Sequence, residues 1–295
     1  MKENDNHPPA VRDCRVVCAF RARLFFLLFL LVCPLGRTRS DSCLDRPVLH
    51  PGERLTYELY FKWGFLMPKA GLAQFSVSEA RYGNLPAWEY RMQFHTVGMF
   101  ERIFKMRDTL TTYFSPVQQL LFSDKRTDEG GYYLADRMYF TPLSSGETSV
   151  RSLRHNRSGL RLDTTLVVGG CAFDMMAATL YLRAIGWQDL KVRDEFPFRV
   201  VVGKDVVRAS FRYTGQAVVS PGGRVKYRTH HFFIDVYDPA FEQSKEAAEV
   251  WIGDDENHLP IRVRAKLAIG AVEVYLGDAV NLRHAFASRI PGVGN

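Results

Sequence analysis

The stretch Leu55-Thr56-Tyr57-Glu58-Leu59-Tyr60-Phe61-Lys62 alternates large apolar side chains with more polar ones. Successive side chains of a β-strand point to opposite faces, so this alternation predicts a strand with one buried and one wet face. The same period of two returns along the chain, most clearly at residues 89–95, 207–213 and 261–269. Strands that are wet on one face are typical of antiparallel sheets, because buried parallel strands are apolar throughout.

Turn motifs separate these runs at short intervals. They are Gly83-Asn84, Ser115-Pro116, Glu129-Gly130-Gly131, Ser144-Ser145-Gly146, Ser158-Gly159, Pro221-Gly222-Gly223 and Asn257-His258-Leu259-Pro260. Short links favour hairpins, and the pattern predicts roughly a dozen strands. We therefore expect a mainly β protein with one large curved antiparallel sheet, an open or half barrel. Its single β-rich domain is predicted over residues 54–286, after an N-terminal extension at 41–53 and before a flexible tail at 287–295.

One segment departs from the period of two. Residues 173–185 contain good helix formers, with Asp174 near the start and Gly186 past the end. Apolar positions fall on one face at helical spacing: Met175, Ala178, Leu182 and Ile185. We expect this helix to cover the concave side of the sheet. Asp174 is interpreted as the residue that caps the helix rather than as an acid in a pocket.

The first forty residues have the parts of a secretory signal. Arginines precede a ten-residue apolar run at 24–33, and Thr38-Arg39-Ser40 offers small residues around a cleavage site. A membrane-spanning helix needs about 20 apolar residues, so residues 1–40 are interpreted as a cleaved signal peptide. Cys33 and Cys43 lack the neighbours of a lipidation signal, so lipoprotein anchoring is not favoured. The predicted location is the periplasm, with no transmembrane segment after cleavage.

Discounting the signal peptide leaves a nearly balanced charge. Residues 1–40 hold seven Lys/Arg and three Asp/Glu, thus +4 of the chain's +7, which leaves +3 on the remainder. This balance does not indicate the basic face that nucleic-acid binding requires. Cys43 and Cys171 remain after cleavage. Disulfides persist outside the cytosol, but sequence does not show whether two cysteines meet, so a bridge and two free thiols both stay open.

Motifs of catalysis are missing from the sequence. It has no Gly-x-Ser-x-Gly, no phosphate-binding Gly-x-x-x-x-Gly-Lys, no His-Glu-x-x-His and no Cys-x-x-Cys. His230 and His231 would point to opposite faces of a strand and so are not expected to share a metal. Six arginines could form an anion-binding face, although acidic partners on neighbouring strands and simple solvation explain most of them: Arg199, Arg208, Arg212, Arg228, Arg262 and Arg264. We predict no catalytic residue, no metal and no cofactor.

Two loops are apolar where hairpin loops are usually polar. They are residues 63–68 and 98–104. Exposed apolar loops at the rim of a sheet favour a lipid or acyl ligand, a membrane or a protein partner; alternatively, the loops tuck back and close the core. For a ligand groove the loops would form the gate and the helix the lining, since methionine suits an adaptable pocket. The predicted groove residues are Trp63, Phe65, Met67, Met99, Phe100, Met175, Met176 and Tyr181.

Three segments together resemble a known family. They are Tyr57–Gly64 leading to Ala70–Ala73, the helix Phe173–Arg183, and Trp251-Ile252 through Leu259-Pro260-Ile261 to Leu267–Gly270. The ordered set resembles the exported bacterial family catalogued as domain of unknown function 3108. That family is similar in layout to the lipoprotein-carrier and outer-membrane-receptor fold of LolA and LolB, in which a curved sheet covered by helices binds acyl chains.

The resemblance implies an exported protein that binds or carries a lipid-like ligand in the concave face of its sheet, and it supplies no catalytic residues. The alternative is a structural or assembly factor of the cell envelope. Such a factor would bind a protein partner through the same apolar rim loops.

Overall fold

The computed structural model describes residues 43–223, 225–237, 245–267 and 269–291. The predicted signal peptide lies outside these residues. Sixteen strands of the described chain form one sheet, in which fifteen follow the order β8-β7-β6-β5-β4-β3-β2-β1-β15-β14-β13-β12-β11-β10-β9 and β16 pairs with β12. All neighbours are antiparallel except β10 and β9. Most neighbours are consecutive in sequence, as expected from the short turns between alternating runs.

The elements have the following bounds. The first wing of the sheet consists of β1 (Arg54–Lys62), β2 (Lys69–Tyr82), β3 (Leu85–Thr96), β4 (Arg107–Phe114), β5 (Leu120–Glu129), β6 (Tyr132–Pro142), β7 (Glu147–Asn156) and β8 (Gly159–Gly169). The second wing consists of β9 (Ala172–Phe173), β10 (Glu195–Val202), β11 (Asp205–Val219), β12 (Lys226–Tyr237), β13 (Ala248–Gly253), β14 (Pro260–Lys266), β15 (Ala271–Val280) and β16 (Arg289–Ile290). The helices are α2 (Gly98–Ile103), α3 (Met175–Ala184) and the short η1 (Pro221–Gly223).

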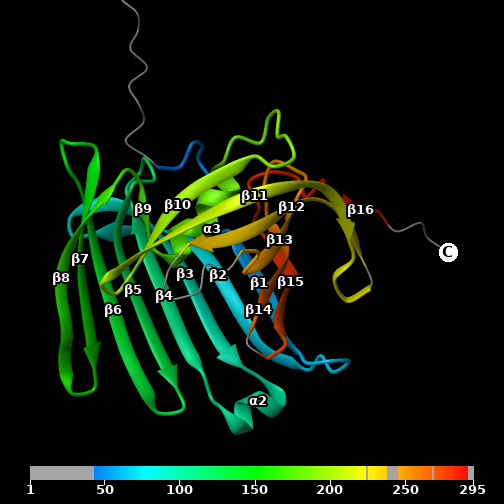
Figure 1. The fold of residues 1–295 in the computed structure, drawn as a ribbon, viewed down its shortest axis with the longest axis horizontal. Helices are drawn as coiled ribbons and strands as arrows, with labels where there is room; N and C mark the ends of the chain where they lie inside the picture. The colour runs from blue at the N-terminus through cyan, green and yellow to red at the C-terminus, as the bar shows by residue number, and fades with distance from the viewer. Residues whose placement is uncertain (1–42, 224, 238–244, 268, 292–295) are drawn as a thin grey trace, which may run out of the picture. The chain divides into compact units, whose positions relative to one another are not determined.

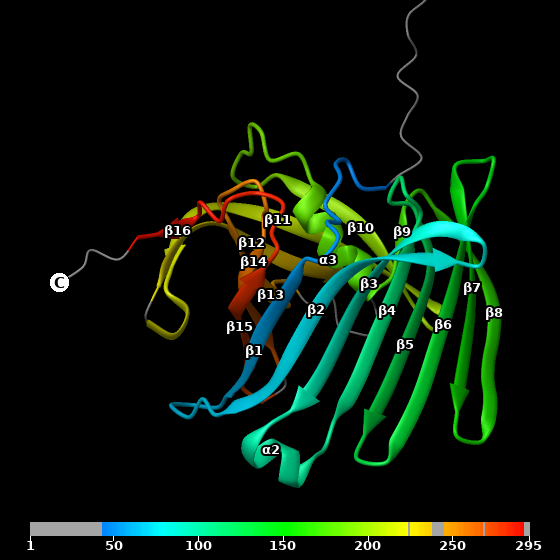
Figure 2. The ribbon, with the colours of Figure 1, turned by 180° about the vertical axis from the view of Figure 1, so that it is seen from behind.

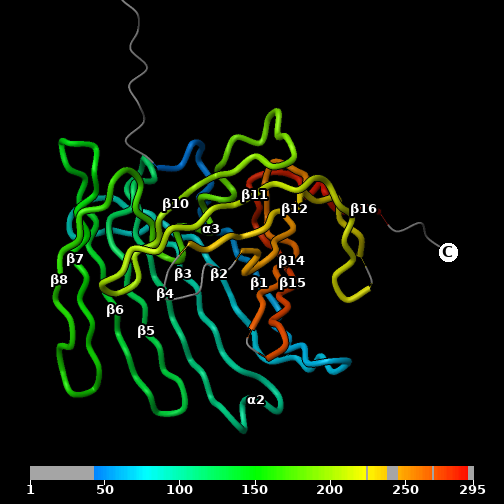
Figure 3. The backbone as a smooth tube through the Cα atoms, in the orientation of Figure 1, coloured from blue at the N-terminus to red at the C-terminus, as the bar shows by residue number. Residues whose placement is uncertain are grey.

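The sheet curls into a nearly closed barrel (Figures 1 and 2). The tube in Figure 3 shows the first wing as a long row of hairpins, with β10 and β11 crossing over it. Val201 of β10 accordingly packs in one cluster with Met138 of β6 and Val150 of β7. The expectation of a curved antiparallel sheet is confirmed, and the sheet closes further, with more strands, than a half barrel of a dozen.

Helix α3 lies inside the barrel between the two wings (Figure 1). Its buried side chains, among them Leu180, pack with Tyr90 of β3 on one side and Phe211 of β11 on the other. Asp174 caps the helix, because its carboxylate accepts a hydrogen bond from the Ala177 N–H at 2.7 Å. The predicted helix and its cap are confirmed. Apolar side chains of both wings pack against α3, so the helix is part of the core of the barrel.

The N-terminal segment before β1 is part of the core. Leu44, Val48 and Leu49 are buried against α3 and its neighbours. A disulfide joins Cys43 to Cys171, with a Cα–Cα distance of 5.6 Å. Of the two alternatives left open by the sequence, the structure contains the bridge.

The C-terminal segment also makes regular contacts beyond the predicted domain end. Arg289 and Ile290 pair with Tyr227 and Lys226 of β12. Strand pairing therefore reaches Ile290, past residue 286, where the tail was expected to begin.

Candidate ligand-binding site

A small apolar cavity lies between α3 and the inner face of the sheet. Its volume is about 120 Å³. Its lining comes from α3 and from β1, β2, β3, β14 and β15: Leu55, Tyr57, Phe75, Tyr90, Thr179, Arg183, Pro260, Val263 and Val274. An apolar concavity with a few polar groups is typical of a small-molecule site, although whole-ligand pockets usually reach about 300–1,000 Å³. The cavity therefore suits the end of a chain-like ligand.

The inner face of β1 remains apolar from this cavity to the rim of the barrel. Leu55 and Tyr57 are buried, Leu59 and Phe61 are half-buried, and Trp63 just beyond the strand is 61% exposed. Exposure thus rises along one face of one strand, from α3 toward the end where α2 lies (Figure 1). The cavity is the deep end of an apolar inner face that becomes accessible near the rim.

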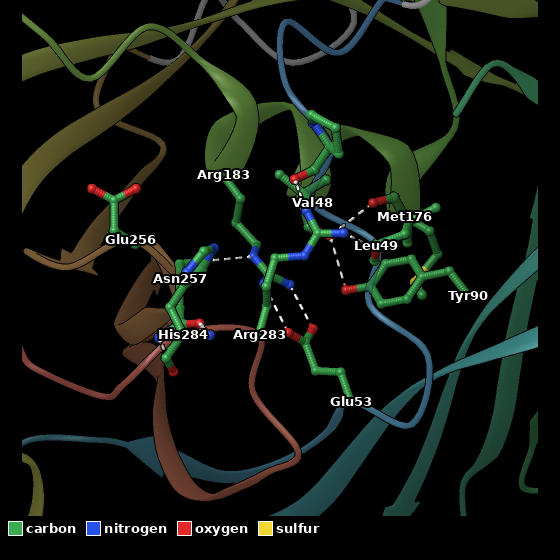
Figure 4. A network of polar contacts seen from close by, with 12 residues as sticks. Val48, Leu49, Glu53, Tyr90, Met176, Arg183, Glu256, Asn257, Arg283 and His284 are labelled. Carbon is green, nitrogen blue, oxygen red and sulfur yellow. Dashed lines mark hydrogen bonds and ion pairs between the residues drawn. The ribbon is translucent and has the colours of Figure 1, made fainter. Parts of the chain in front are cut away.

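A buried ion pair lies at the deep end of the inner face, where Arg183 lines the cavity; Figure 4 shows this pair and the polar network around it. Arg183 of α3 donates from its two terminal nitrogens to the carboxylate oxygens of Glu53, at 2.7 and 2.9 Å. It also donates from Nε to the backbone carbonyl of Asn257 at 3.2 Å. Burial works to lower the pKa of Arg183, but attraction and hydrogen bonding to Glu53 raise it above its ordinary value. Arg183 is charged and neutralised by its partner, so it offers little attraction to an anionic ligand.

Further hydrogen bonds tie the N-terminal segment over this end. Arg46 donates from Nε to the backbone carbonyl of Arg183 at 3.2 Å. Arg283, from the segment after β15, donates to the carbonyl of Pro47 at 2.9 Å. Figure 4 shows Arg283 and Glu53 on either side of the same network. Three stretches far apart in sequence therefore hold one another at the deep end.

The hydroxyl groups in the cavity are suited to hydrogen bonding. Burial raises the pKa of Tyr90 to about 12, and burial also raises the pKa of Tyr57 well above its ordinary value. The Tyr90 hydroxyl lies 3.3 Å from the Thr179 hydroxyl. Both tyrosines stay protonated at neutral pH, which suits hydrogen bonds to a ligand and not attack as a nucleophile.

The helix residues that were predicted to line the groove do not lie at the cavity in the structure. Met175 is 49% exposed, on the outward side of α3. Met176 is buried in the core, and Tyr181 stacks on Phe173 with ring centroids 5.1 Å apart. Neither methionine nor Tyr181 lines the cavity; α3 lines it through Thr179 and Arg183. The helix face predicted from apolar residues does not include Thr179 and Arg183, although their spacing of four residues places them on one face of α3.

The predicted gate residues lie together at the rim and not at the cavity. Trp63, Phe65, Met67 and Met99 are exposed. Phe100 is half-buried and packs edge-on against Phe61, with ring centroids 6.2 Å apart. For the strand residues that do line the cavity, such as Tyr57 of β1, the period-two pattern predicted an inward side chain but no contact with a cavity.

The histidine pair contacts different partners. His230 Nδ1 lies 3.0 Å from the Tyr213 hydroxyl, and His231 Nδ1 lies 2.6 Å from the Thr214 hydroxyl. Within the described ranges no group of three His, Cys, Asp or Glu residues is placed to hold a metal ion. None of the helices in that part of the chain is long and apolar enough to cross a membrane.

The arginines on the outer face are largely paired across strands. Arg262 donates to both carboxylate oxygens of Glu273, at 2.9 and 3.0 Å, and Arg264 lies 3.7 Å from Glu249. A wider depression of about 360 Å³ lies on β10 and β11 and includes Arg208 and Tyr237.

These features define a class: a nearly closed, mainly antiparallel β-barrel-like protein with an internal helix and an apolar inner face. The chain belongs to the family described as protein of unknown function DUF3108, whose model matches residues 56–277. The resemblance inferred from the three sequence segments is thereby confirmed at the level of this family.

Three bacterial proteins are among the solved structures that match this chain. A β-barrel-like protein of the domain of unknown function DUF1849 from Brucella abortus is 10% identical, with a TM-score of 0.51 over 81% of this chain and 100% of that one. A protein assumed to be exported, with a YmcC-like fold, from Bacteroides fragilis is 9% identical (TM-score 0.29; 81% and 100% covered). An assumed lipoprotein from Parabacteroides distasonis is 10% identical (TM-score 0.30; 81% and 99% covered). No curated protein matches the chain. The first likeness supports the fold alone.

Proposed function

We propose that this protein is exported to the periplasm and binds or carries a lipid-like ligand on the inner face of its sheet, without catalysing a reaction. The apolar cavity beneath α3 is the observation that carries the proposal. One end of an acyl chain would lie against Leu55, Phe75 and Val274. Each buried methylene would contribute about 0.8 kcal/mol. The predicted similarity in layout to the LolA and LolB carriers belongs to the same proposal.

Two observations support the location. The first forty residues have the pattern of a secretory signal. The disulfide between Cys43 and Cys171 is a bond that persists in oxidising compartments such as the periplasm.

The proposal of a non-catalytic role is supported by the polar groups at the cavity. The Tyr90 hydroxyl is paired with a threonine hydroxyl and not with a base. The Arg183 guanidinium is occupied by Glu53. Nucleophilic catalysis needs a nucleophile beside a base that activates it.

Extraction of the native protein tests the proposal. Protein purified from the periplasm would be extracted with organic solvent, and the extract analysed by mass spectrometry for lipids. The variant Val274→Trp fills the cavity and should lose the bound lipid, whereas Val218→Trp, at an exposed position of β11, should retain it. Val263→Phe is a milder filling variant should the first fail to fold. Repeated absence of lipid from the unaltered protein would refute the proposal.

A further inference from the structure

The exposed aromatic side chains of the described residues gather at one rim of the barrel. Trp63, Phe65, Phe104 and Tyr132 are the aromatic residues there that are more than a third exposed. Trp63 and Phe65 lie in the β1–β2 turn, Phe104 follows α2, and Tyr132 begins β6. Figures 1 and 2 place α2 and the β1–β2 turn at the same end of the sheet. The turns at the opposite end expose aliphatic residues instead.

Backbone contacts join these turns into one rim. The Val97 N–H before α2 donates to the Ala70 carbonyl at 3.0 Å, and the Gly130 N–H of the β5–β6 turn donates to the Lys105 carbonyl at 2.8 Å. On the other side Lys62 pairs with Ala271 at the β14–β15 turn. We define the rim as the described residues of the segments 62–69, 98–107 and 264–271. Three connections thus present their tips side by side.

The tips of the rim project into solvent. Phe65 is 95% exposed and Ile103 is 72% exposed. Met99 and Ile103 are four residues apart in α2, so they lie on one face of it. The Arg107 guanidinium and the Thr96 hydroxyl donate to the Glu101 carboxylate and lower its pKa to about 2. These bonds hold α2 with its apolar face outward.

The rim is basic as well as apolar. Residues 62–69, 98–107 and 264–271 contain seven Lys or Arg and one acid, Glu101. Ion pairs within the described chain engage four of the cations: Lys69, Arg107, Arg264 and Lys266. They do not engage Lys62, Arg102 or Lys105. Acidic residues border the rim at Asp108 of β4 and at Asp128 and Glu129 at the end of β5.

We propose that this rim docks on a lipid bilayer that carries anionic headgroups. Aromatic side chains favour the membrane interface, apolar tips contribute by burial among the acyl chains, and lysine or arginine beside them is attracted to anionic lipid. A protein partner would need one contiguous complementary surface, whereas a bilayer accepts separate projecting side chains such as Phe65 and Ile103. Docking places the accessible end of the inner apolar face against the membrane.

Vesicle binding tests this proposal whether or not a ligand occupies the inner face, so its failure is distinguishable from failure of the proposed function. Protein purified from the periplasm would be mixed with phosphatidylcholine vesicles with and without phosphatidylglycerol, and binding measured by cosedimentation. Vesicles with brominated acyl chains would quench the fluorescence of Trp63. The structure describes all four tryptophans of the chain, and Trp63 is the one whose side chain is mainly exposed. We expect the protein to bind the anionic vesicles and the Trp63 fluorescence to be quenched. Added salt should weaken the binding, because it screens the attraction between the basic residues and the anionic lipid.

Three double variants separate the contributions of basic and apolar side chains to vesicle binding. Arg102→Gln with Lys105→Gln should weaken binding about twenty-five-fold, at about fivefold for each basic residue. Phe65→Ser with Ile103→Ser should weaken it more than a hundredfold, at about tenfold or more for each large apolar side chain. Leu85→Ser with Val117→Ser, in turns at the opposite end, should leave it unchanged. Circular dichroism would check that each variant is folded.

Several results would overturn the proposal. Absence of vesicle binding, equal binding to uncharged vesicles, or unquenched Trp63 would each do so. A crosslinker at Phe65 that yields one reproducible protein adduct in cells, with no vesicle binding in vitro, would favour the assembly-factor alternative instead.

Discussion

Replacing Glu53 by glutamine should destabilise the protein severely. Glu53 and Arg183 are 2% and 4% exposed, and they share two hydrogen bonds. The substitution keeps the shape but removes the negative charge, so the guanidinium remains buried without its counter-charge. Removing one partner of a buried pair costs about 3–5 kcal/mol.

The size of this loss can be read as a shift in melting temperature. For domains of 150–250 residues each kcal/mol corresponds to about 2–4 °C, so Glu53→Gln should lower the melting temperature by about 6–20 °C. Urea denaturation followed by circular dichroism would measure the free energy of unfolding directly. The midpoint should fall while the slope stays unchanged, because the surface exposed on unfolding is the same.

Two controls make the reasoning refutable. Asp163 and Arg151 form a pair of similar geometry on the exposed outer face, where solvent screens the charges, so Asp163→Asn should cost far less stability than Glu53→Gln. Replacing both buried partners, Glu53→Leu with Arg183→Met, should recover most of the loss because no unpaired charge remains. A Glu53→Gln loss no larger than that of Asp163→Asn would refute the account of a buried charge pair.

Three further predictions follow from other contacts. Reducing the disulfide, or Cys43→Ser with Cys171→Ser, should lower the free energy of unfolding by up to about 5 kcal/mol for a loop closed over 128 residues, measured by denaturation with and without reductant. The pKa of the Glu101 carboxylate is lowered from 4.5 to about 2, so this group should contribute stability that is fully present above pH 4.5 and lost as the pH falls toward 2. An NMR titration of this carboxyl group with a midpoint above pH 4 would contradict the prediction. Gly270→Ala should disrupt the β14–β15 turn and lower the melting temperature, because the added carbon would clash with the Lys62 carbonyl oxygen. The control Gly83→Ala is also at positive φ but in open space, so its melting temperature should fall only by the effect of backbone strain.

The period of two was enough to predict most of the fold. In β1 the alternation from Leu55 to Phe61 gives the inward face of the strand correctly. Sequence did not show how far the sheet closes, because closure depends on packing between distant strands, such as the cluster that holds Val201 of β10 together with Val150 of β7. Such contacts arise from the accumulated twist of many strands and leave no local pattern.

The candidate site was harder to predict than the fold. Methionines and aromatic residues were the groove residues predicted from the sequence, yet α3 lines the cavity through Thr179 and Arg183. Arg183 reads in sequence as an ordinary helix residue near a C-terminus. Its role depends on Glu53, 130 residues earlier, which no spacing rule connects to it.

The two ends of the barrel differ in chemistry, and this difference bears on how a ligand would enter. At the deep end a disulfide, the Glu53–Arg183 pair and the hydrogen bonds of Arg46 and Arg283 cross-link segments that are far apart in sequence. Opening this end requires breaking a covalent bond or separating buried charges. At the rim, neighbouring turns are joined by a few backbone contacts and expose their largest side chains. Local opening costs least where few buried contacts are lost, so hydrogen exchange should be faster in α2 than in α3. A ligand would therefore enter at the rim, the end that we propose to lie against the membrane.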